Sequence, residues 1–257
     1  MDITSLQNPR VKHIVKLRED KKQRQKDRLI LVEGYDELNL ALACGFQPQT
    51  LLSAPELVSQ SLTVPNAESL TVSRAVFEKI SYRDNPDGWL GLFPMPTSNL
   101  DSLSLSEQPL VIVAESVEKP GNLGAILRTA DAAHVDAVLV CDPRVDVWNP
   151  NTIRASRGAV FAVPVVEVKS ADALNWLRSR KMRVLAATPS AEAMYTELNM
   201  QGPLAIAVGT EDEGLTDFWM QNSDLRVKIP MMGKVNSLNV SIATALMTYE
   251  AVRQRAK

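Results

Sequence analysis

Histidine, cysteine and aromatic residues are scarce in this chain of 257 residues. The few histidines and cysteines argue against metal sites and catalytic triads. The two histidines, His13 and His134, and the two cysteines, Cys44 and Cys141, have neither the spacing of metal ligands nor that of a catalytic triad, so we expect no metal. Two isolated cysteines fit reduced thiols in a reducing cytosol. No apolar run approaches the roughly 18 residues that span a bilayer, and the polar N-terminus does not resemble a signal peptide. We therefore expect a cytoplasmic protein that makes no membrane contact.

Two glycine-rich nucleotide-binding motifs are also missing. No GxGxxG sequence follows the first strong strand pattern, and no P-loop lysine is present. An ordinary dinucleotide or nucleoside triphosphate site is therefore disfavoured.

The charge of the chain is distributed unevenly. The net charge is −2, yet residues 1–28 carry nine Lys or Arg residues against four Asp or Glu residues. A local basic arm on a mildly acidic protein favours contact with a phosphate backbone. A solvated helix with an ordinary charged face would give the same pattern, so the arm alone does not decide the function. The basic residues of the arm that we predict to contact RNA are Arg10, Lys12, Lys21, Lys22 and Arg24.

The first part of the chain reads as a compact α/β unit. The patterns predict helices over 3–28, 35–44, 56–61 and 76–80, and strands over 29–32, 50–53, 70–73 and 88–93. Residues 94–108 are rich in Pro, Ser and Asn and lack any sustained period, which indicates a linker. We place a smaller domain at residues 1–95, a linker at 96–107 and a second domain at 108–257.

The second domain alternates apolar runs with helical patterns. Strands are predicted at 110–114, 137–141, 163–166, 184–187, 204–208 and 227–229, and helices at 123–133, 150–158, 171–180, 216–222 and 239–255. This alternation is typical of a doubly wound α/β domain with a parallel sheet.

A first motif, residues 122–128, opens the first helix of this domain. Asn122 can cap the helix, and Arg128 lies one turn after Gly124. Helical side chains lean toward the helix N-terminus, so the Arg128 guanidinium would pass over Gly124 and reach the preceding loop, where it could hold a phosphate. A surface arginine on a capped helix remains an alternative.

Two further motifs follow later strands. In residues 209–214, Gly209 ends a strand where a ligand could approach the backbone, although the nearby carboxylates could simply offset a helix dipole. The third motif comprises residues 229–233 and 237–241, in which Ser237 is a suitable N-cap and Asn239 lies in the first turn of the last helix. These polar groups would converge on the loop after Gly209, or they would only cap the terminal helix.

Together, and in this order, the three motifs resemble the signature motifs of the SpoU/TrmH family of RNA ribose 2′-O-methyltransferases, in the SPOUT superfamily. Residues 108–257 resemble its catalytic domain and residues 1–95 its L30e-like substrate-binding domain, the latter through the basic arm and residues 5–10, 31–34 and 82–88. The resemblance implies S-adenosylmethionine bound in a C-terminal trefoil knot, a homodimer formed through the C-terminal domain, and an RNA substrate. We expect ribosomal RNA as the substrate, with transfer RNA as the alternative.

The resemblance also assigns site residues. The catalytic residues would be Arg128, Asn122, Glu211, Ser237 and Asn239. The residues that bind the cofactor would be Gly209, Ile229, Met231, Leu238 and Thr188. Arg154 would contact RNA or a second subunit.

The reaction requires a ribose hydroxyl, a poor nucleophile, to lose its proton as it attacks the methyl group. The motifs contain no histidine or lysine base, so Arg128 acting with the substrate phosphate is the remaining candidate. Because arginine is a very weak base, proximity and orientation should supply much of the acceleration. The alternatives are a transfer RNA 2′-O-methyltransferase, a base methyltransferase, a catalytically silent RNA- or ribosome-binding protein, and a small-molecule α/β enzyme.

Overall fold

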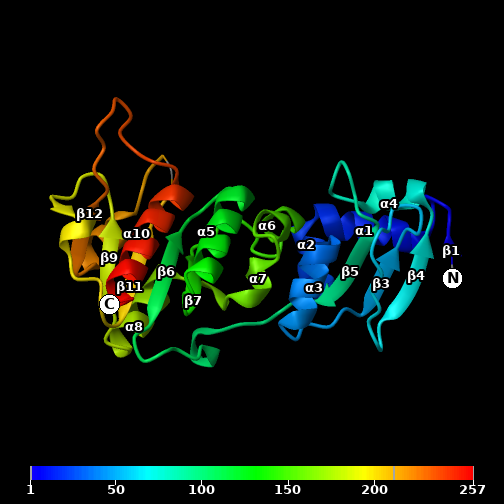
Figure 1. The fold of residues 1–257 in the computed structure, drawn as a ribbon, viewed down its shortest axis with the longest axis horizontal. Coiled ribbons are helices and arrows are strands. Elements are labelled where there is room, and N and C mark those ends of the chain that lie inside the picture. Colours follow the sequence, from blue (N-terminus) through cyan, green and yellow to red (C-terminus); the bar gives the residue numbers. More distant parts are fainter. Residues whose placement is uncertain (1, 211, 257) are drawn as a thin grey trace. The chain divides into compact units, whose positions relative to one another are not determined.

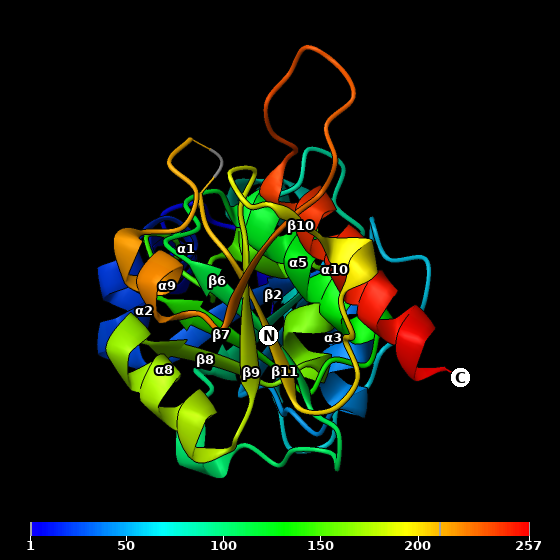
Figure 2. The ribbon, with the colours of Figure 1, turned by 90° about the vertical axis from the view of Figure 1, so that its left-hand side faces the viewer.

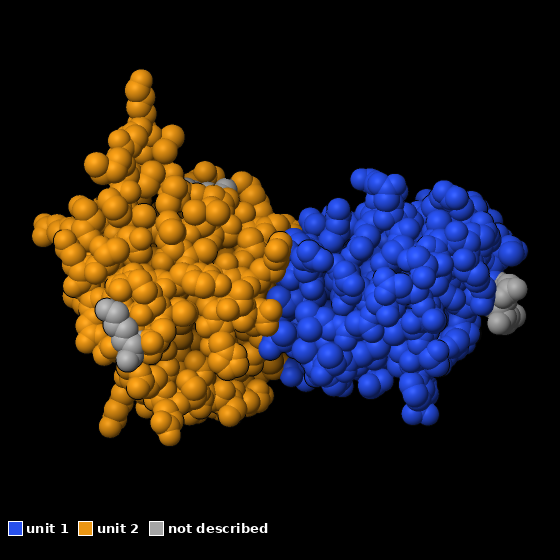
Figure 3. Space-filling view, in the orientation of Figure 1, with its two compact units in different colours: residues 1–97, 146–162 blue, residues 98–145, 163–257 orange. Residues whose placement is uncertain are grey.

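The computed structural model describes residues 2–210 and 212–256, and the chain divides into two compact units (Figure 3). Unit 1 comprises residues 1–97 and 146–162, and unit 2 comprises residues 98–145 and 163–257. Residues 146–162, which the sequence pattern predicted to belong to the second domain, fold with unit 1.

The reason is visible in the packing of that segment, which forms helices α6 (Pro150–Ala155) and α7 (Ala159–Ala162). Helix α6 packs on strand β2 (Leu29–Glu33) and α7 packs on helix α3 (Tyr35–Ala43). A Cβ atom on Gly158 would lie 3.3 Å from the Cα atom of Glu37, so glycine permits this close approach.

Unit 1 is built on a five-stranded mixed sheet in the order β1-β4-β3-β5-β2 (Figure 1). Its remaining strands are β1 (Asp2–Ile3), β3 (Thr50–Ser53), β4 (Glu68–Val72) and β5 (Trp89–Pro94). Its remaining helices are α1 (Pro9–Glu19), α2 (Lys21–Asp27) and α4 (Arg74–Ile80). Strand β5 is antiparallel to both β2 and β3, while the other pairs are parallel.

Three predicted helices of unit 1 differ from the structure, each for a local reason. The helix predicted over 3–28 is two helices, because Asp20 is extended and its carboxylate accepts the Lys22 amide hydrogen at 2.8 Å, which starts α2. The helix predicted over 56–61 is a single turn closed on the Ala54 carbonyl, and the Gln60 carbonyl accepts the Trp89 indole N–H instead. The helix predicted over 150–158 ends as α6 at Ala155, since residues 157 and 158 both adopt positive φ.

The interior of unit 1 contains one buried ion pair beside its apolar core. The Arg24 side chain from α2 is 2% exposed and donates to Asp146 Oδ2 from Nη2 at 2.5 Å and from Nε at 3.1 Å. Its Nη1 donates to the carbonyls of Leu17 and Arg18 at 2.6 and 3.1 Å. Every side of the guanidinium is therefore occupied, and the pair ties α2 to the segment that returns at residue 146.

Unit 2 is built on a seven-stranded sheet in the order β10-β12-β9-β11-β6-β7-β8, and all of its strand pairs are parallel. The strands are β6 (Leu110–Glu115), β7 (Ala137–Cys141), β8 (Val165–Val168), β9 (Arg183–Ala187), β10 (Ala193–Met194), β11 (Leu204–Val208) and β12 (Leu225–Lys228). The predicted α/β class with a parallel sheet is confirmed, and the trefoil knot stays a prediction.

Helices cover both faces of this sheet, with α5 (Pro120–Ala132) and α10 (Val240–Arg255) packed together on one face, and α8 (Ser170–Ser179) and α9 (Asp217–Asn222) on the other (Figure 2). Two 3₁₀ helices complete the unit, η1 (Leu100–Ser102) and η2 (Tyr195–Glu197). Burial raises the pKa of the Cys141 thiol on β7, and Asp142 raises it further, so this thiol stays protonated and unreactive.

Within the described part of the chain, no helix has the length and apolar content to cross a membrane. Among the same residues, no group of three or more His, Cys, Asp or Glu side chains is arranged to hold a metal ion.

The Arg24–Asp146 pair generates a prediction about stability. Arg24→Met leaves the Asp146 carboxylate buried without its cation, so the free energy of unfolding should fall by about 3–5 kcal/mol. Urea unfolding followed by circular dichroism measures this. The matched control is Arg74→Met. The Arg74 side chain is 60% exposed and its Glu78 partner 50%, so this ion pair should contribute only about 0–1 kcal/mol to the free energy of unfolding. Equal losses for the two variants would contradict the structural role of Arg24.

Candidate active site

A cleft of about 710 Å³ opens at the carboxyl ends of the adjacent strands β12, β9 and β11. Ligands of open α/β sheets bind at this edge, because the loops that leave parallel strands gather there. Three loops form the walls, one after each strand, and the start of α10 closes the cleft. The walls mix apolar side chains such as Val208, Leu215 and Leu238 with hydroxyl and carboxylate groups.

The cleft collects residues that lie far apart in the sequence. All five residues predicted to bind a cofactor line it, as does Ser237 from the predicted catalytic set. These five are Thr188 after β9, Gly209 after β11, and Ile229, Met231 and Leu238 after β12.

The loop after β11 is folded tightly back on itself. The Thr210 amide donates to the Gly214 carbonyl at 3.0 Å, and the Gly214 amide donates to the Thr210 carbonyl at 3.1 Å. A Cβ atom on Gly209 would overlap the carbonyl of Gly214, so only glycine fits beneath this closed turn. Gly209 therefore fixes the shape of one wall of the cleft.

A buried carboxylate, which was not among the predicted site residues, anchors the end of this loop. Glu115 ends β6 and is 2% exposed. Its carboxylate accepts the amide hydrogen of Thr216 at 2.8 Å and the Thr216 hydroxyl hydrogen at 2.7 Å. A charged residue that ends an otherwise apolar strand was the available signal, because a buried carboxylate needs donors from another segment.

A smaller pocket of about 110 Å³ adjoins the cleft. It shares four lining residues with the cleft, namely Thr210, Asp212, Glu213 and Val240. Its other lining residues are Val117, Glu118, Lys119, Asn122 and Arg144, from the loops after β6 and β7 and the start of α5. The two cavities therefore share a wall, and the smaller one is the more polar of the two.

The first and third sequence motifs meet beside this pocket. Asn239 Nδ2 donates to Asn122 Oδ1 at 3.2 Å, across 117 residues of sequence. Asn239 Oδ1 accepts the Ser241 amide hydrogen at 3.0 Å, so Asn239 and not Ser237 is the N-cap of α10. Asn122 is likewise not the cap of α5, because Pro120 starts that helix and places Asn122 in its first turn. The capping predictions were wrong, and the amide of Asn239 meets Asn122 of the first motif, a contact that the sequence did not predict.

The remaining predicted catalytic residues have different outcomes. Arg128 lies exposed on α5, does not line either cavity, and forms no hydrogen bond or ion pair with the residues that the structure describes. The expected reach of its guanidinium over Gly124 into the loop is therefore not seen. Glu211 lies outside the described residues.

The predicted RNA contacts in unit 1 divide into two groups. Lys12, Lys21, Lys22 and Arg154 are exposed, and Arg10 is exposed while paired with Glu68 at 2.7 Å. Arg24 does not fit the prediction, because its guanidinium is buried against Asp146 and has no face left for a phosphate.

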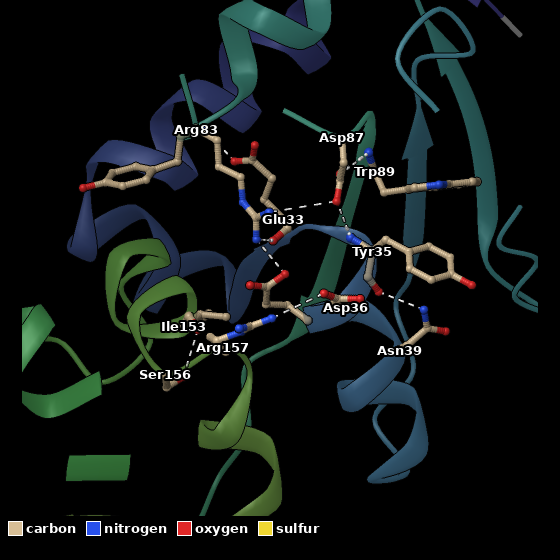
Figure 4. Close-up of polar contacts among 12 residues, drawn as sticks. Glu33, Tyr35, Asp36, Asn39, Arg83, Asp87, Trp89, Ile153, Ser156 and Arg157 are labelled. Atoms are coloured by element: carbon tan, nitrogen blue, oxygen red, sulfur yellow. Dashed lines mark hydrogen bonds and ion pairs between the residues drawn. The ribbon is translucent and has the colours of Figure 1, made fainter. Parts of the chain in front are cut away.

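Two of the three short stretches of unit 1 that supported the family resemblance, 31–34 and 82–88, also meet (Figure 4). Glu33 is buried and accepts hydrogen bonds from the Ser81 hydroxyl at 2.5 Å and the Tyr82 amide at 2.6 Å. Arg83 Nη2 lies 2.6 Å from Glu37 Oε2 and donates to the Glu33 carbonyl at 3.0 Å. This network fixes residues 82–88 against the start of α3.

Comparison with known proteins places the chain in a family. Residues 109–249 match the SpoU rRNA Methylase family, and residues 8–91 match an MRM3-like substrate binding domain. The 23S rRNA (guanosine(2553)-2′-O)-methyltransferase RlmP of Bacillus subtilis is 29% identical, over 96% of this chain and 97% of its own.

Solved structures give the same result. An RNA 2′-O ribose methyltransferase superposes with a TM-score of 0.88 at 41% identity and covers 100% of both chains. An rRNA methyltransferase of Sinorhizobium meliloti with bound AdoMet (S-adenosylmethionine) gives a TM-score of 0.89 at 31% identity, over 98% of this chain and 97% of that one. The sequence motifs, the parallel sheet and these matches agree, and the chain belongs to the SpoU rRNA methylase family.

Proposed function

We propose that this protein transfers a methyl group from S-adenosylmethionine to a ribose 2′-hydroxyl of RNA, with ribosomal RNA as the substrate class. The observation that carries the proposal is the cofactor-sized cleft at the carboxyl edge of the unit 2 sheet, together with the polar pocket that shares one of its walls. The names of the matched relatives, which include 23S ribosomal RNA 2′-O-methyltransferases, support the same reaction and substrate.

The cleft fits S-adenosylmethionine in size and in chemistry. Its volume lies within the range of about 300–1,000 Å³ that is usual for small-molecule sites. Backbone groups near Gly209, Ile229 and Leu238 would hold the adenosine and methionine parts, with Thr188 and Met231 beside them. When bound, S-adenosylmethionine supplies an electrophilic methyl group on a positively charged sulfur.

The polar pocket is the place for the acceptor ribose. The hydrogen-bonded amides of Asn122 and Asn239 would orient the sugar, because amides both donate to and accept from hydroxyl groups. Arg128 would bind the neighbouring phosphate and help to remove the proton from the 2′-hydroxyl. Its exposure on α5 leaves the guanidinium open to such a ligand. Since arginine is a weak base, most of the acceleration would come from holding the hydroxyl in line with the methyl group.

Unit 1 would supply the affinity for structured RNA. The exposed lysines of α1 and α2 offer phosphate contacts that do not depend on base sequence. The exposed Arg154 on α6 would add a further contact from the same unit. In this proposal, residues 1–95 form the core of the substrate-binding domain, to which 146–162 are added, and unit 2 holds the chemistry.

The catalytic prediction is tested first on cellular RNA. Nucleosides from ribosomal and transfer RNA are compared by mass spectrometry between cells with and without the gene, and the RNA lacking the modification is then treated with purified protein and S-adenosylmethionine. We expect one 2′-O-methyl nucleoside of ribosomal RNA to be lost on deletion, restored by the wild type, and not restored by Arg128→Ala. Loss from transfer RNA would change the substrate class, and unchanged RNA of both kinds would favour a silent binding protein.

A second prediction concerns the cofactor wall. Gly209→Ala forces the closed turn at 210–214 to move, so the dissociation constant for S-adenosylmethionine should rise by about ten- to a hundredfold. Isothermal titration calorimetry measures it. Gly121→Ala is the control, because a Cβ atom there meets no other group within 4 Å. Unchanged cofactor binding by Gly209→Ala would show that the cofactor does not use this wall.

We also propose a homodimer formed through unit 2. Helix α10 carries three large exposed apolar side chains, Ile242, Leu246 and Tyr249, which are 52%, 40% and 48% exposed. Their spacing of four and three residues puts them on one face of the helix, and such a stripe is typical of a protein interface.

Analytical ultracentrifugation tests the oligomeric state. At micromolar concentration we expect the wild type to sediment as a dimer and Leu246→Lys to shift toward the monomer, because a charge would be buried in the interface. Lys181→Glu changes charge just beyond α8 and should leave the dimer intact. A monomeric wild type would reject this proposal.

A further inference from the structure

The ion pair between Arg144 and Glu118 at the polar pocket has no role in the proposed binding of the cofactor or the acceptor ribose. Arg144 lies in the loop after β7 and its Nη1 is 2.5 Å from Glu118 Oε1, in the loop after β6. Both residues line the small pocket. The Arg144 and Glu118 side chains are 53% and 51% exposed, so the pair lies at the surface where the pocket opens to solvent.

The surroundings of Arg144 are acidic. Among the described residues, the carboxylates of Glu118, Asp212 and Glu213 line the pocket, against the cations Lys119 and Arg144. The hydrogen bond and the charge of Glu118 raise the pKa of Arg144, and Glu213 and Glu115 raise it further. Arg144, like any arginine, is a cation, and it lies within a group of negative charges that would otherwise repel an RNA backbone.

The kind of ion pair matters as much as its place. A half-exposed pair contributes little to folding stability, because water screens both charges. The buried Arg24–Asp146 pair in unit 1 is the opposite case, because its side chains are only 2% and 10% exposed and all three guanidinium nitrogens donate hydrogen bonds. Glu118 therefore holds Arg144 in place, but the folding stability depends little on this ion pair. Arg144 can exchange Glu118 for another anion at small cost, and a guanidinium binds phosphate in a bidentate geometry.

We propose that Arg144 binds a backbone phosphate next to the target nucleotide, and that Glu118 occupies the guanidinium in the RNA-free protein. The proposal rests on the proposed function, since it places this phosphate beside the pocket for the acceptor ribose. Arg144 lies in the loop after β7 and Arg128 lies on helix α5, so the two arginines would hold the nucleotide from two elements. Release of Glu118 from Arg144 would accompany RNA binding.

The test is steady-state methyl transfer to a ribosomal RNA substrate, with RNA as the varied component and several KCl concentrations. The variants are Arg144→Gln, Glu118→Gln, the double variant, and Arg180→Gln as the control. Arg180 follows α8 and stacks over Trp176 at 5.4 Å, near the amino end of β9 and thus at the opposite edge of the sheet from the pocket. The control removes the same charge from the same unit.

Arg144→Gln should raise KM for RNA by about tenfold, the usual effect of losing one hydrogen bond between charged groups. Its kcat and its affinity for S-adenosylmethionine should stay at the wild-type level. The dependence of log KM on log salt should become shallower by about one unit, as expected for one lost phosphate contact. Arg180→Gln should change none of these quantities.

Glu118→Gln should lower KM for RNA, because Arg144 is then unpaired and one negative charge is gone. In the Arg144→Gln background the same substitution should have a smaller effect, which separates release of Arg144 from simple loss of repulsion. A general structural role predicts instead that Arg144→Gln lowers S-adenosylmethionine affinity along with RNA affinity.

The proposal is overturned if Arg144→Gln matches Arg180→Gln in KM and salt dependence, or if cofactor affinity falls in parallel. Failure of the proposed function is a different result, because the wild type would then transfer no methyl group to any RNA. In that case, direct RNA binding by the same variants, measured by filter binding across the salt series, still decides whether Arg144 contacts phosphate.

Discussion

Parallel pairing of β11 with β9 on one side and β6 on the other is the constraint on which the site depends. The register places Val208 beside Ala114, so Gly209 and Glu115 leave the sheet at the same level. Because all strands run in one direction, the loops after β9, β11 and β12 leave from one edge, and so do those after β6 and β7. Residues separated by more than 100 positions in sequence, such as Glu115 and Thr216, become neighbours at that edge. Shifting the β11 register would separate the cofactor wall from its buried anchor.

The loops at this edge are held by different forces, and this difference divides their roles. The loop after β11 is closed by its own backbone hydrogen bonds and tied to Glu115, a buried carboxylate whose unpaired state would be costly. The pair between Glu118 and Arg144 is half exposed and can be broken at little cost. The site thus combines a rigid wall for a small cofactor with an adaptable polar rim for a larger ligand. Rigid positioning is what orientation-based catalysis requires, and adaptable contacts are what binding and release of RNA require.

The sequence predicted the features of the fold that depend on local pattern. Apolar runs of five residues identified strands such as 110–114 and 204–208 almost to the residue, and the motif at 209–214 directly follows one of them. The errors arose where a side chain acts over a distance or where two local signals compete. Asp20 stops one helix and starts the next, and a composition-based reading cannot distinguish it from the charged residues around it. Asn239 replaces Ser237 as the cap of α10, since both residue types suit that position and only the course of the preceding loop decides between them.

The arginines show most clearly why residue type alone does not give function. Arg24 and Arg144 both face carboxylates, and no property of the local sequence separates them. The Arg24 guanidinium on α2 is surrounded by two backbone carbonyls and Asp146, so its charge serves the fold and is not available to a ligand. Arg144 has the same kind of partner at the surface of an acidic pocket, so its charge remains available to a ligand. Burial, which is a property of the whole unit, separates an arginine that stabilises the fold from one that can recognise a phosphate. A basic stretch in a sequence therefore sets an upper limit on the number of RNA contacts, and packing decides which of its members reach the RNA.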